Sequence, residues 1–366
     1  MHMRAAVLRE HGGPFKMEDL ELAEPGMGEL LVEVAGVGFC HTDVMPRAEA
    51  FMAEPPLILG HEGSGVVVAA GPCTTITVGT PVVMSFDHCG RCANCLDGHP
   101  AYCRSFWGRN MVGRSRSSSP VTDVAGRSIG ARWFGQSSFA THALTREDAV
   151  VPVPSDLPLE LLGPLACSVL TGAGAVFNTL AVSAGDSIAV YGAGAVGLSA
   201  VMAAAATGAT QVIAIDRHKE RLELALELGA TEVIDTQCLS QELGQEVVAR
   251  SAGGTRTALD TTGVAPVIAS AVTGLRTRGI LGMVSMASSD IVLQRDALAT
   301  GKTITGILEG DSVPRIHIPR LITLWRGGHL PFERLIQTYP MNDINQAEAD
   351  MASGRTIKPV LIPHSR

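Results

Sequence analysis

The spacing of apolar and polar positions changes along this chain. In the first third, short apolar runs such as "ELLVEVAGVGF" and "GSGVVVAAG" alternate with Gly, Pro and Thr turns. This pattern is typical of an irregular, mostly antiparallel β domain. From about residue 169, strand patterns alternate with helical ones or turns, as in "SIAVYGAGAVG", "QVIAID", "EVIDT", "TALDTTG" and "GILGMVSM". The second pattern predicts a parallel, doubly wound α/β sheet.

Two further stretches refine this division. The residues from Ser187 to Ile215 carry no charge and are numerous enough to span a bilayer. Glycines divide them into a β-branched run, a turn, an alanine-rich helix and a second β-branched run, so they predict a buried βαβ unit. Near the C-terminus, "IPRLITLWRGGHLPFERLI" predicts an amphipathic helix that ends at Gly327 and Gly328.

Length and charge narrow the class of protein. A chain of 366 residues favours two domains, and 17% charged residues with a net charge of −8 give no electrostatic reason to expect nucleic acid or an anionic membrane as partner. We therefore expect a small-molecule ligand. The N-terminal "MHMRAAVLREHGGPF" has no apolar region of signal-peptide length, which leads us to expect a cytoplasmic protein.

Four cysteines lie close together in "DHCGRCANCLDGHPAYC", with the spacing C-x2-C-x2-C-x7-C: Cys89, Cys92, Cys95 and Cys103. A cytoplasmic protein keeps its thiols reduced, which disfavours disulfides. Four thiolates that close a tetrahedron predict a structural zinc site, and an iron–sulfur cluster is the main rival. A zinc ion held by four cysteines has no open position for a substrate, so we expect this loop to be structural.

Three separate segments carry sparser ligands: Cys40 in "GFCHTD", His61 in "GHEGSG" and Cys167 in "PLACSVLTG". Taken singly, a buried cysteine or histidine is most often a structural residue. Together, two sulfurs and one imidazole would form a three-ligand zinc site with an open fourth position. An alcohol oxygen would bind at that position.

In these motifs and their order the chain resembles the zinc-dependent medium-chain alcohol dehydrogenases. The resemblance covers nearly the whole chain, from "CHTD" through "PLACS" to the closing "GRTIKPVLIP". It implies an irregular, β-rich, GroES-like catalytic domain at 1–168 and 309–366, and a Rossmann domain at 169–308. It also implies two zinc ions, with Cys40, His61 and Cys167 as catalytic ligands. Asp43 is then the carboxylate that orients His61, and Glu62 is the acidic neighbour of the zinc.

The glycine-rich turn in "YGAGAVG" predicts a dinucleotide site. Gly192, Gly194 and Gly197 stand between a strand and a helix, and Asp216 ends the next strand. Such glycines allow a diphosphate to approach a helix N-terminus, while the carboxylate accepts hydrogen bonds from the ribose. Because Asp216 would repel a 2′-phosphate, NAD is favoured over NADP.

Several basic residues are candidates for further cofactor contacts. The resemblance implies that His41 and Lys358 contact the pyrophosphate and that Arg221 lies near the adenosine ribose. Arg217 follows Asp216 directly and would weaken the preference for NAD. The alternative for each is an exposed basic side chain on a helix or turn.

The resemblance also implies a route for the proton of the alcohol. Thr42 resembles the hydroxyl that takes this proton and passes it to the cofactor ribose. In many relatives a histidine follows five residues after the first cysteine, but here the position is Met45, which carries no proton. Water, another group or slower proton release would have to replace that histidine.

Aromatic residues bear on the substrate. Seven of the chain's fifteen aromatic side chains fall within residues 86–139, and aromatic walls suit a planar ring. Trp133 and Phe134 are predicted to face the substrate, with Met286 and Leu308 as further wall residues. "FGQSSFATHA" and "ILEGDSVP" resemble the aryl (benzyl) alcohol dehydrogenase subgroup. We therefore expect reversible oxidation of primary aromatic or allylic alcohols, such as benzyl alcohol, geraniol or perillyl alcohol, to aldehydes.

Two alternatives stay open from the sequence. One is a glutathione-dependent formaldehyde dehydrogenase or a short aliphatic alcohol dehydrogenase of the same fold, and the other is a non-catalytic dinucleotide-binding protein. The family also implies a homo-oligomer, dimer or tetramer. Its sheet would continue across two cofactor domains, with residues 278–286 as a candidate edge strand.

Overall fold

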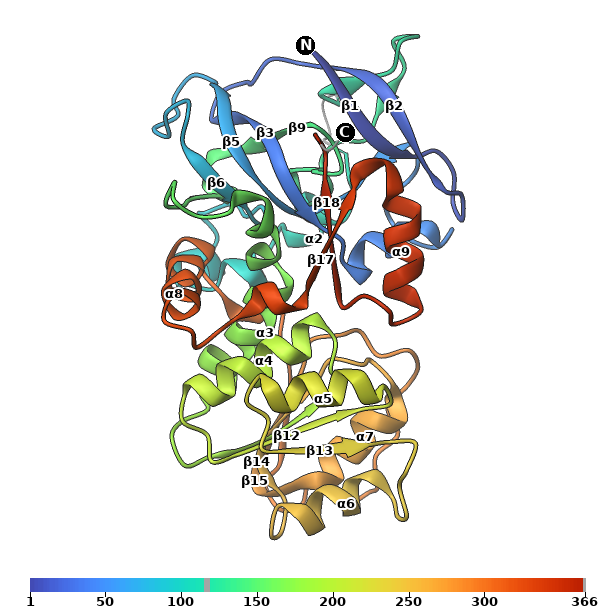
Figure 1. Ribbon diagram of the computed structural model, residues 1–366, viewed down its shortest axis with the longest axis vertical. Coiled ribbons are helices and arrows are strands. Elements are labelled where there is room, and N and C mark those ends of the chain that lie inside the picture. Colours follow the sequence, from blue (N-terminus) through green and yellow to red (C-terminus); the bar gives the residue numbers. More distant parts are fainter. Residues whose placement is uncertain (115–118, 365–366) are drawn as a thin grey trace. The chain divides into compact units, whose positions relative to one another are not determined.

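The computed structural model describes residues 1–114 and 119–364, which form two compact units (Figure 1). Unit 1 comprises Met1–Cys167, Val313–Pro319 and Glu333–Arg366, and unit 2 comprises Ser168–Ser312 and Arg320–Phe332. Compared with the predicted domains, residues 168, 309–312 and 320–332 fall in unit 2. The domain boundaries proposed from the sequence stay a prediction.

Unit 1 is built from short strands in two sheets, one with the order β4-β1-β2-β7-β8 and one with the order β10-β6-β5-β3-β18-β17, where β9 also pairs with β3. The strands are β1 (His2–Leu8), β2 (Phe15–Leu22), β3 (Glu29–Gly38), β4 (Leu57–Ile58), β5 (Glu62–Ala70), β6 (Pro81–Met84), β7 (Val121–Thr122), β8 (Ser128–Ile129), β9 (His142–Arg146), β10 (Val150–Pro152), β17 (Ile336–Pro340) and β18 (Lys358–Ile362). All their pairings are antiparallel except β17 with β18. The prediction of an irregular, mostly antiparallel β domain is confirmed.

Short helices connect or cover these strands: α1 (Ala93–Leu96), α2 (Phe106–Asn110) and α9 (Ile344–Ala352). α8 (Pro314–Arg326) begins in unit 1 and ends in unit 2. It ends just before Gly327 and Gly328, as its amphipathic pattern predicts, because glycine stops a helix readily. β18 brings the C-terminal segment into the middle of the larger sheet, beside β3.

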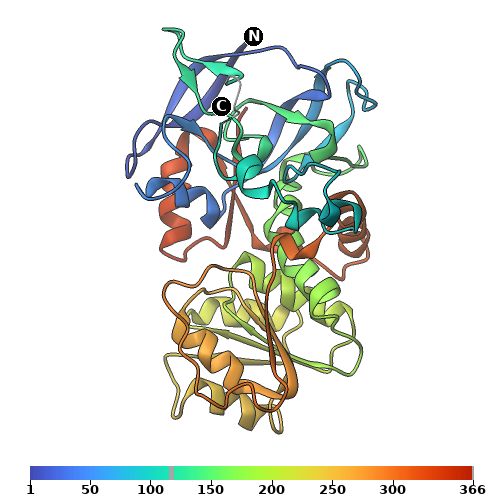
Figure 2. The ribbon, with the colours of Figure 1, turned by 180° about the vertical axis from the view of Figure 1, so that it is seen from behind.

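Unit 2 is a parallel sheet with the order β13-β12-β11-β14-β15-β16. Its elements are α3 (Ser168–Gly174), β11 (Ser187–Tyr191), α4 (Ala195–Ala206), β12 (Gln211–Asp216), α5 (Lys219–Glu227), β13 (Glu232–Asp235), α6 (Leu243–Arg250), β14 (Thr255–Asp260), α7 (Ala265–Gly274), β15 (Leu275–Met283) and β16 (Thr303–Gly306). α4 and α5 lie in front of the sheet in Figure 1, and α7 lies in front of it in Figure 2. The predicted doubly wound sheet and its βαβ unit are therefore confirmed.

The strand predicted as the edge of this sheet is not its edge. β15 pairs on one side with β14 and on the other with β16, so β16 is the outer strand in the described part of the chain. The sequence "TITG" of β16 is too short and too polar to have been recognised as a strand from its pattern. Nor is any helix of the described residues long and apolar enough to cross a bilayer.

The core of unit 2 shows why these residues form a sheet. Ala189 and Tyr191 of β11 point to one face, where they pack with Val247 of α6 and Ile268 of α7. This period-two alternation buries every second strand residue under the helices on that face.

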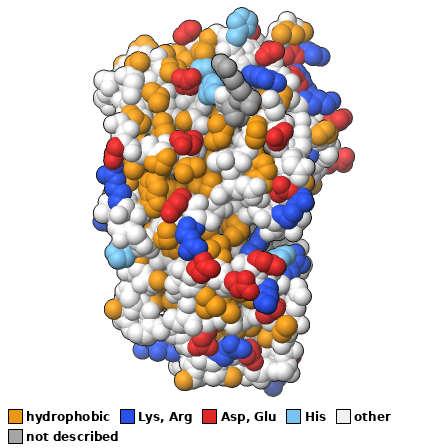
Figure 3. Space-filling model, viewed as in Figure 1, with side chains coloured by type: hydrophobic (Ala, Val, Ile, Leu, Met, Phe, Trp, Pro, Cys, Tyr) orange, Lys and Arg blue, Asp and Glu red, His pale blue; other side chains and the backbone are white. Residues whose placement is uncertain are grey.

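On the face of the molecule shown in Figure 3, acidic and basic side chains are interspersed.

Candidate metal and cofactor sites

The four cysteines of the loop come together around one point. Their sulfur atoms all lie within 4.8 Å of one another, with 3.5 Å between Cys92 and Cys95 and 3.9 Å between Cys89 and Cys95. A tetrahedron with Zn–S bonds of about 2.3 Å requires sulfur separations of about 3.8 Å. A disulfide would need about 2.05 Å, and an iron–sulfur cluster would need room for several atoms between the cysteines. The donor set therefore fits a single zinc ion.

Backbone N–H groups turn toward these sulfurs. The N–H of Cys92 donates to Cys89 Sγ at 3.3 Å, and the N–H groups of Cys89 and Ser105 donate to Cys103 Sγ at 3.4 Å. Such bonds stabilise the thiolate form. A backbone hydrogen bond from Arg104 is the largest of the contributions that lower the pKa of Cys92 to about 6. The loop is therefore prepared by its own backbone to hold a cation.

Cys40, His61 and Cys167, predicted from three separate segments, also converge. Their ligand atoms and a carboxylate oxygen of Glu62 all lie within 4.8 Å of one another, and His61 Nε2 is 3.3 Å from Cys167 Sγ. Two thiolates and one imidazole within this distance fit a zinc ion that keeps a further position for another ligand. All of these residues belong to unit 1.

Asp43 is the centre of a hydrogen-bond network behind this group. Its Oδ1 accepts from His61 Nδ1 at 2.8 Å, from Trp133 Nε1 at 2.9 Å and from the N–H of Gly60 at 3.1 Å, and its Oδ2 accepts from the N–H of Cys40 at 3.1 Å. Because Asp43 is an acceptor, His61 carries its proton on Nδ1 and turns Nε2 toward Cys167. Burial acts to lower the pKa of His61, but the carboxylate of Asp43 outweighs it and raises that pKa well above its usual value.

Further contacts fix the imidazole and its backbone. The ring of Phe134 stacks on that of His61, with 4.4 Å between centroids and 26° between planes. Gln136 Nε2 donates to the carbonyl oxygen of His61 at 2.9 Å, and its Oε1 accepts from the N–H of Gly63 at 3.1 Å. Gln136 is buried, so this amide clamps both sides of the peptide segment that carries the ligand.

Glu62 forms a buried ion pair. Lys358 Nζ lies 3.0 Å from both carboxylate oxygens of Glu62 and donates to the carbonyl oxygen of Phe39 at 3.0 Å. Burial acts to lower the pKa of Lys358, but the attraction of Glu62 outweighs it and that pKa is raised. Gly38 makes room for the pair, because a Cβ there would lie 2.0 Å from Glu62 Oε2.

The predicted dinucleotide turn lies between β11 and α4. Gly192 has φ = 98°, in the left-handed region, and a Cβ on Gly197 would lie 1.8 Å from the carbonyl oxygen of Gly192. Asp216 Oδ2 accepts from the N–H of Ala193 at 2.6 Å, so the end of β12 is tied to the turn. A Cβ on Gly194 would meet nothing within 4 Å, which leaves the helix N-terminus open for a diphosphate.

Known proteins share both halves of this arrangement. Residues 26–155 match the model of the alcohol dehydrogenase GroES-like domain, and residues 195–324 match that of the zinc-binding dehydrogenases. Over 364 residues the chain is 44% identical to the geraniol dehydrogenase of Castellaniella defragrans, covering 98% of this chain and 97% of that protein. The chain belongs to the zinc-dependent medium-chain alcohol dehydrogenases.

Two other relatives of this dehydrogenase bear on its chemistry. The crystal structure of benzyl alcohol dehydrogenase from Acinetobacter calcoaceticus matches with a TM-score of 0.93 at 40% identity, covering 99% of each chain. The S-(hydroxymethyl)glutathione dehydrogenase of Synechocystis sp. is 31% identical over an alignment of 377 residues in length, which covers 99% of this chain and all of that protein.

The remaining predicted residues of the dehydrogenase lie in varied surroundings, and their roles stay predictions. Cys40 Sγ is 3.8 Å from Thr42 Oγ1. Of the other candidates, Thr42, Arg221 and Leu308 are partly buried, and His41, Arg217 and Met286 are exposed. Lys358, predicted at the pyrophosphate, is buried and directs its ammonium group to Glu62 and Phe39.

The surroundings of Trp133 differ from those expected of a substrate wall. The side chain is fully buried, its N–H is bound to Asp43, and its ring meets Phe51 at 6.0 Å between centroids. The sequence showed a concentration of aromatic residues, but it did not indicate that one indole nitrogen would reach the zinc-ligand network. The clamp made by Gln136 and the ion pair of Lys358 with Glu62 were also missed, since each joins segments far apart in sequence.

Proposed function

We propose that this dehydrogenase oxidises primary aromatic or allylic alcohols to aldehydes, reversibly and with NAD. The observation that carries the reaction type is the convergence of Cys40, His61 and Cys167 on one point, with Asp43 bound to His61. The substrate class is supported by the names of two whole-length relatives, a geraniol dehydrogenase and a benzyl alcohol dehydrogenase.

The protein's own groups have distinct tasks in this reaction. Cys40, His61 and Cys167 would hold a zinc ion, which would supply Lewis acidity toward an alcohol oxygen, and NAD would supply the hydride acceptor. Asp43 holds the proton of His61 on Nδ1, and Phe134 covers the imidazole and keeps water from one of its faces. Thr42, beside Cys40, is the hydroxyl that we assign to receive the proton of the alcohol. With a thioether at Met45, that proton must reach solvent through water or another group.

The cofactor preference follows from Asp216. Its carboxylate lies at the end of β12, tied to the N–H of Ala193, where a ribose 2′-phosphate would meet a negative charge. Arg217 is next to Asp216 and exposed, and its positive charge weakens this preference for NAD. Comparing kcat/KM for NAD and NADP in the wild type and in Asp216→Ala checks the assignment, since the variant should gain relative activity with NADP.

The decisive experiment compares initial rates of NADH formation with benzyl alcohol, geraniol and ethanol, each over a range of concentrations. A far larger kcat/KM for benzyl alcohol or geraniol supports the proposal. A preference for ethanol would leave the zinc chemistry intact and refute the substrate class. S-(hydroxymethyl)glutathione is included because one relative at 31% identity is named for it, and a kcat/KM for it above those for benzyl alcohol and geraniol would refute the substrate class.

A further inference from the structure

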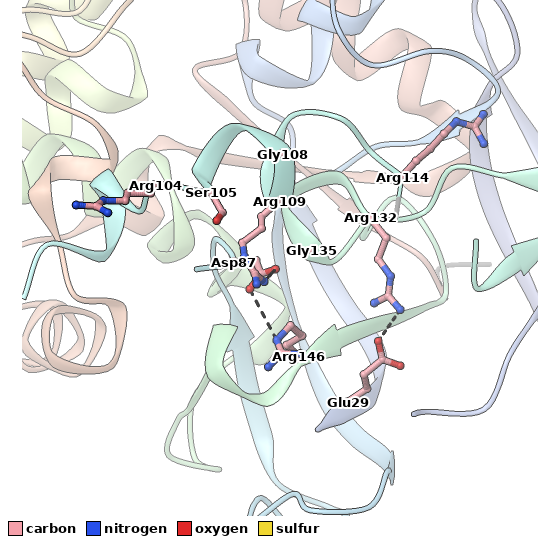
Figure 4. A pocket seen from close by; sticks show the side chains of 10 residues that line it. All are labelled: Glu29, Asp87, Arg104, Ser105, Gly108, Arg109, Arg114, Arg132, Gly135 and Arg146. Carbon is pink, nitrogen blue, oxygen red and sulfur yellow. Dashed lines mark hydrogen bonds and ion pairs between the residues drawn. The ribbon is translucent and has the colours of Figure 1, made fainter. Parts of the chain in front are cut away.

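A cavity of about 720 Å³ in unit 1 is rich in arginine (Figure 4). Its charged lining residues are Glu29, Asp87, Arg104, Arg109, Arg114, Arg132 and Arg146. None of these is a candidate zinc ligand or cofactor contact. The charges of the lining therefore sum to an excess of three positive charges.

Only part of this positive charge is balanced within the lining. Arg109 Nη1 lies 2.8 Å from Asp87 Oδ2, and an Arg132 guanidinium nitrogen lies 2.5 Å from Glu29 Oε1. Arg114 donates instead to the carbonyl oxygen of Pro56 at 2.9 Å. Within the described residues Arg104 forms no ion pair, and in Figure 4 its side chain lies apart from the other four arginines and points away from them.

Two polar atoms of the lining residues have no hydrogen-bond partner among the described residues. Arg109 Nε is buried and has no hydrogen-bond acceptor among the described residues. Asp87, whose side chain is 9% exposed, leaves Oδ1 without a hydrogen bond, and Arg146 Nε stays 4.0 Å away from it. Buried polar atoms of native proteins are nearly always paired. Of these atoms, Arg109 Nε is a donor that calls for an acceptor oxygen, whereas Asp87 Oδ1 is itself an acceptor and faces Arg146.

We propose that this cavity binds a small molecule with at least two negative charges, either a phosphate group or several carboxylates. Guanidinium groups bind such oxyanions through paired N–H donors, and the volume lies within the usual range for small-molecule sites. Arg104 and Arg109 follow Cys103 closely in the chain, whereas Arg132 precedes the turn at Trp133 and Arg146 ends β9 of the larger sheet. The bound anion therefore joins the four-cysteine loop to the larger sheet.

The test is a calorimetric titration of the whole enzyme with pyrophosphate and with citrate, at constant ionic strength. NAD is present at saturation, because pyrophosphate also suits a nucleotide site. We expect saturable binding of at least one probe, and the probe that binds identifies the anion as a phosphate or a polycarboxylate. In Arg109→Gln/Arg146→Gln the affinity should fall at least about tenfold. Arg4→Gln/Arg127→Gln removes two charges from exposed positions of the same unit outside the lining, and it should bind as the wild type does.

Two results would overturn the proposal: no saturable binding of either probe, or equal affinity in the wild type and the Arg109→Gln/Arg146→Gln variant. If the double variant does not fold, the single Arg146→Gln variant carries the test, since Arg146 is 44% exposed and its nearest acidic oxygen is 3.4 Å away. Thermal unfolding provides a second readout, in which the binding probe should raise the midpoint above that in sodium chloride of equal ionic strength. No measurement here requires turnover, so the outcome is independent of the proposed function.

Discussion

Backbone N–H groups support the thiolates of the four-cysteine loop, whereas buried side chains support the ligands around Cys40, His61 and Cys167. The loop needs only local turns, because all its ligands lie within fifteen residues. The second group depends on Asp43, Trp133 and Gln136, which the fold must bring from distant segments. The comparison teaches that a closed site can be encoded locally, whereas an open site needs a scaffold that fixes each ligand.

Removing a ligand of the open site should give the largest effect. His61→Ala should lower kcat/KM for alcohol oxidation by more than about a hundredfold, because the zinc would lose its nitrogen ligand. Far-ultraviolet circular dichroism should be unchanged, and NAD binding should persist. Cys73→Ser, at an exposed cysteine outside both groups, is the matched control and should retain full activity. An active His61→Ala enzyme would refute the ligand assignment.

Removing a ligand of the closed site should instead affect stability. Cys95→Ser should lower the unfolding midpoint and the zinc content by up to one ion per chain, because metal binding to the loop is coupled to its folding. Activity per correctly folded molecule should change little. A stable Cys95→Ser protein with full zinc content would show that the loop does not need this thiolate.

The support of the open site is tested by Asp43→Asn. The amide keeps the shape of the side chain but removes the charge that His61 faces at 2.8 Å. Activity or zinc affinity should fall by about 10–100-fold, with the zinc affinity measured by competition with a chelator. Wild-type affinity and activity would mean that the carboxylate charge is not required.

A smaller effect should follow from Trp133→Phe, which keeps an aromatic ring and removes the N–H bound to Asp43. We expect zinc to be released to a chelator up to about tenfold faster, because one hydrogen bond to a charged group is lost. Trp107→Phe, at a tryptophan that is 48% exposed, should leave the release rate unchanged. Equal rates of zinc release in both variants would mean that Trp133 contributes packing only and that its N–H does not support the site.

The smallest effect concerns the loop after zinc has been removed. The pKa of Cys92 is lowered to about 6 and that of Cys95 is raised to about 12. Above pH 6, Cys92 should therefore be alkylated before Cys95, and its rate should fall as the pH drops through 6 and the thiolate takes up a proton. Mass spectrometry of peptides after brief alkylation measures this order. Preferential labelling of Cys95 would contradict it.

The sequence indicated which candidate ligands would lie together better than it indicated the groups that surround them. Cysteines and histidines in spaced motifs can be recognised as candidate metal ligands from their residue type. The glycines of the turn can be recognised because the turn needs the backbone freedom that glycine provides. The indole N–H of Trp133 donates to Asp43 only because of the orientation of its ring, and no pattern along the chain predicts that orientation. Lys358 was predicted as a cofactor contact from its motif, but its burial beside Glu62 depends on β18 lying next to β3.

The arginine-lined cavity illustrates the same limit. Its arginines are spread over residues 104–146, where they form no motif, and only the fold brings them to the lining of one cavity. Likewise, β16 was not recognised because four residues carry too little periodicity, and its place is set by pairing with β15.

The ion pair of Glu62 with Lys358 has a consequence for synthesis on the ribosome. Glu62 is made early, but its partner lies in β18, near the end of the chain, and a buried carboxylate without its partner is costly. Closing the larger sheet of unit 1 around an ionised Glu62 is therefore costly until the last strand has emerged. Unit 2, whose residues all precede residue 333, is available to fold before then. The half of the enzyme that is translated first is thus the last to be completed.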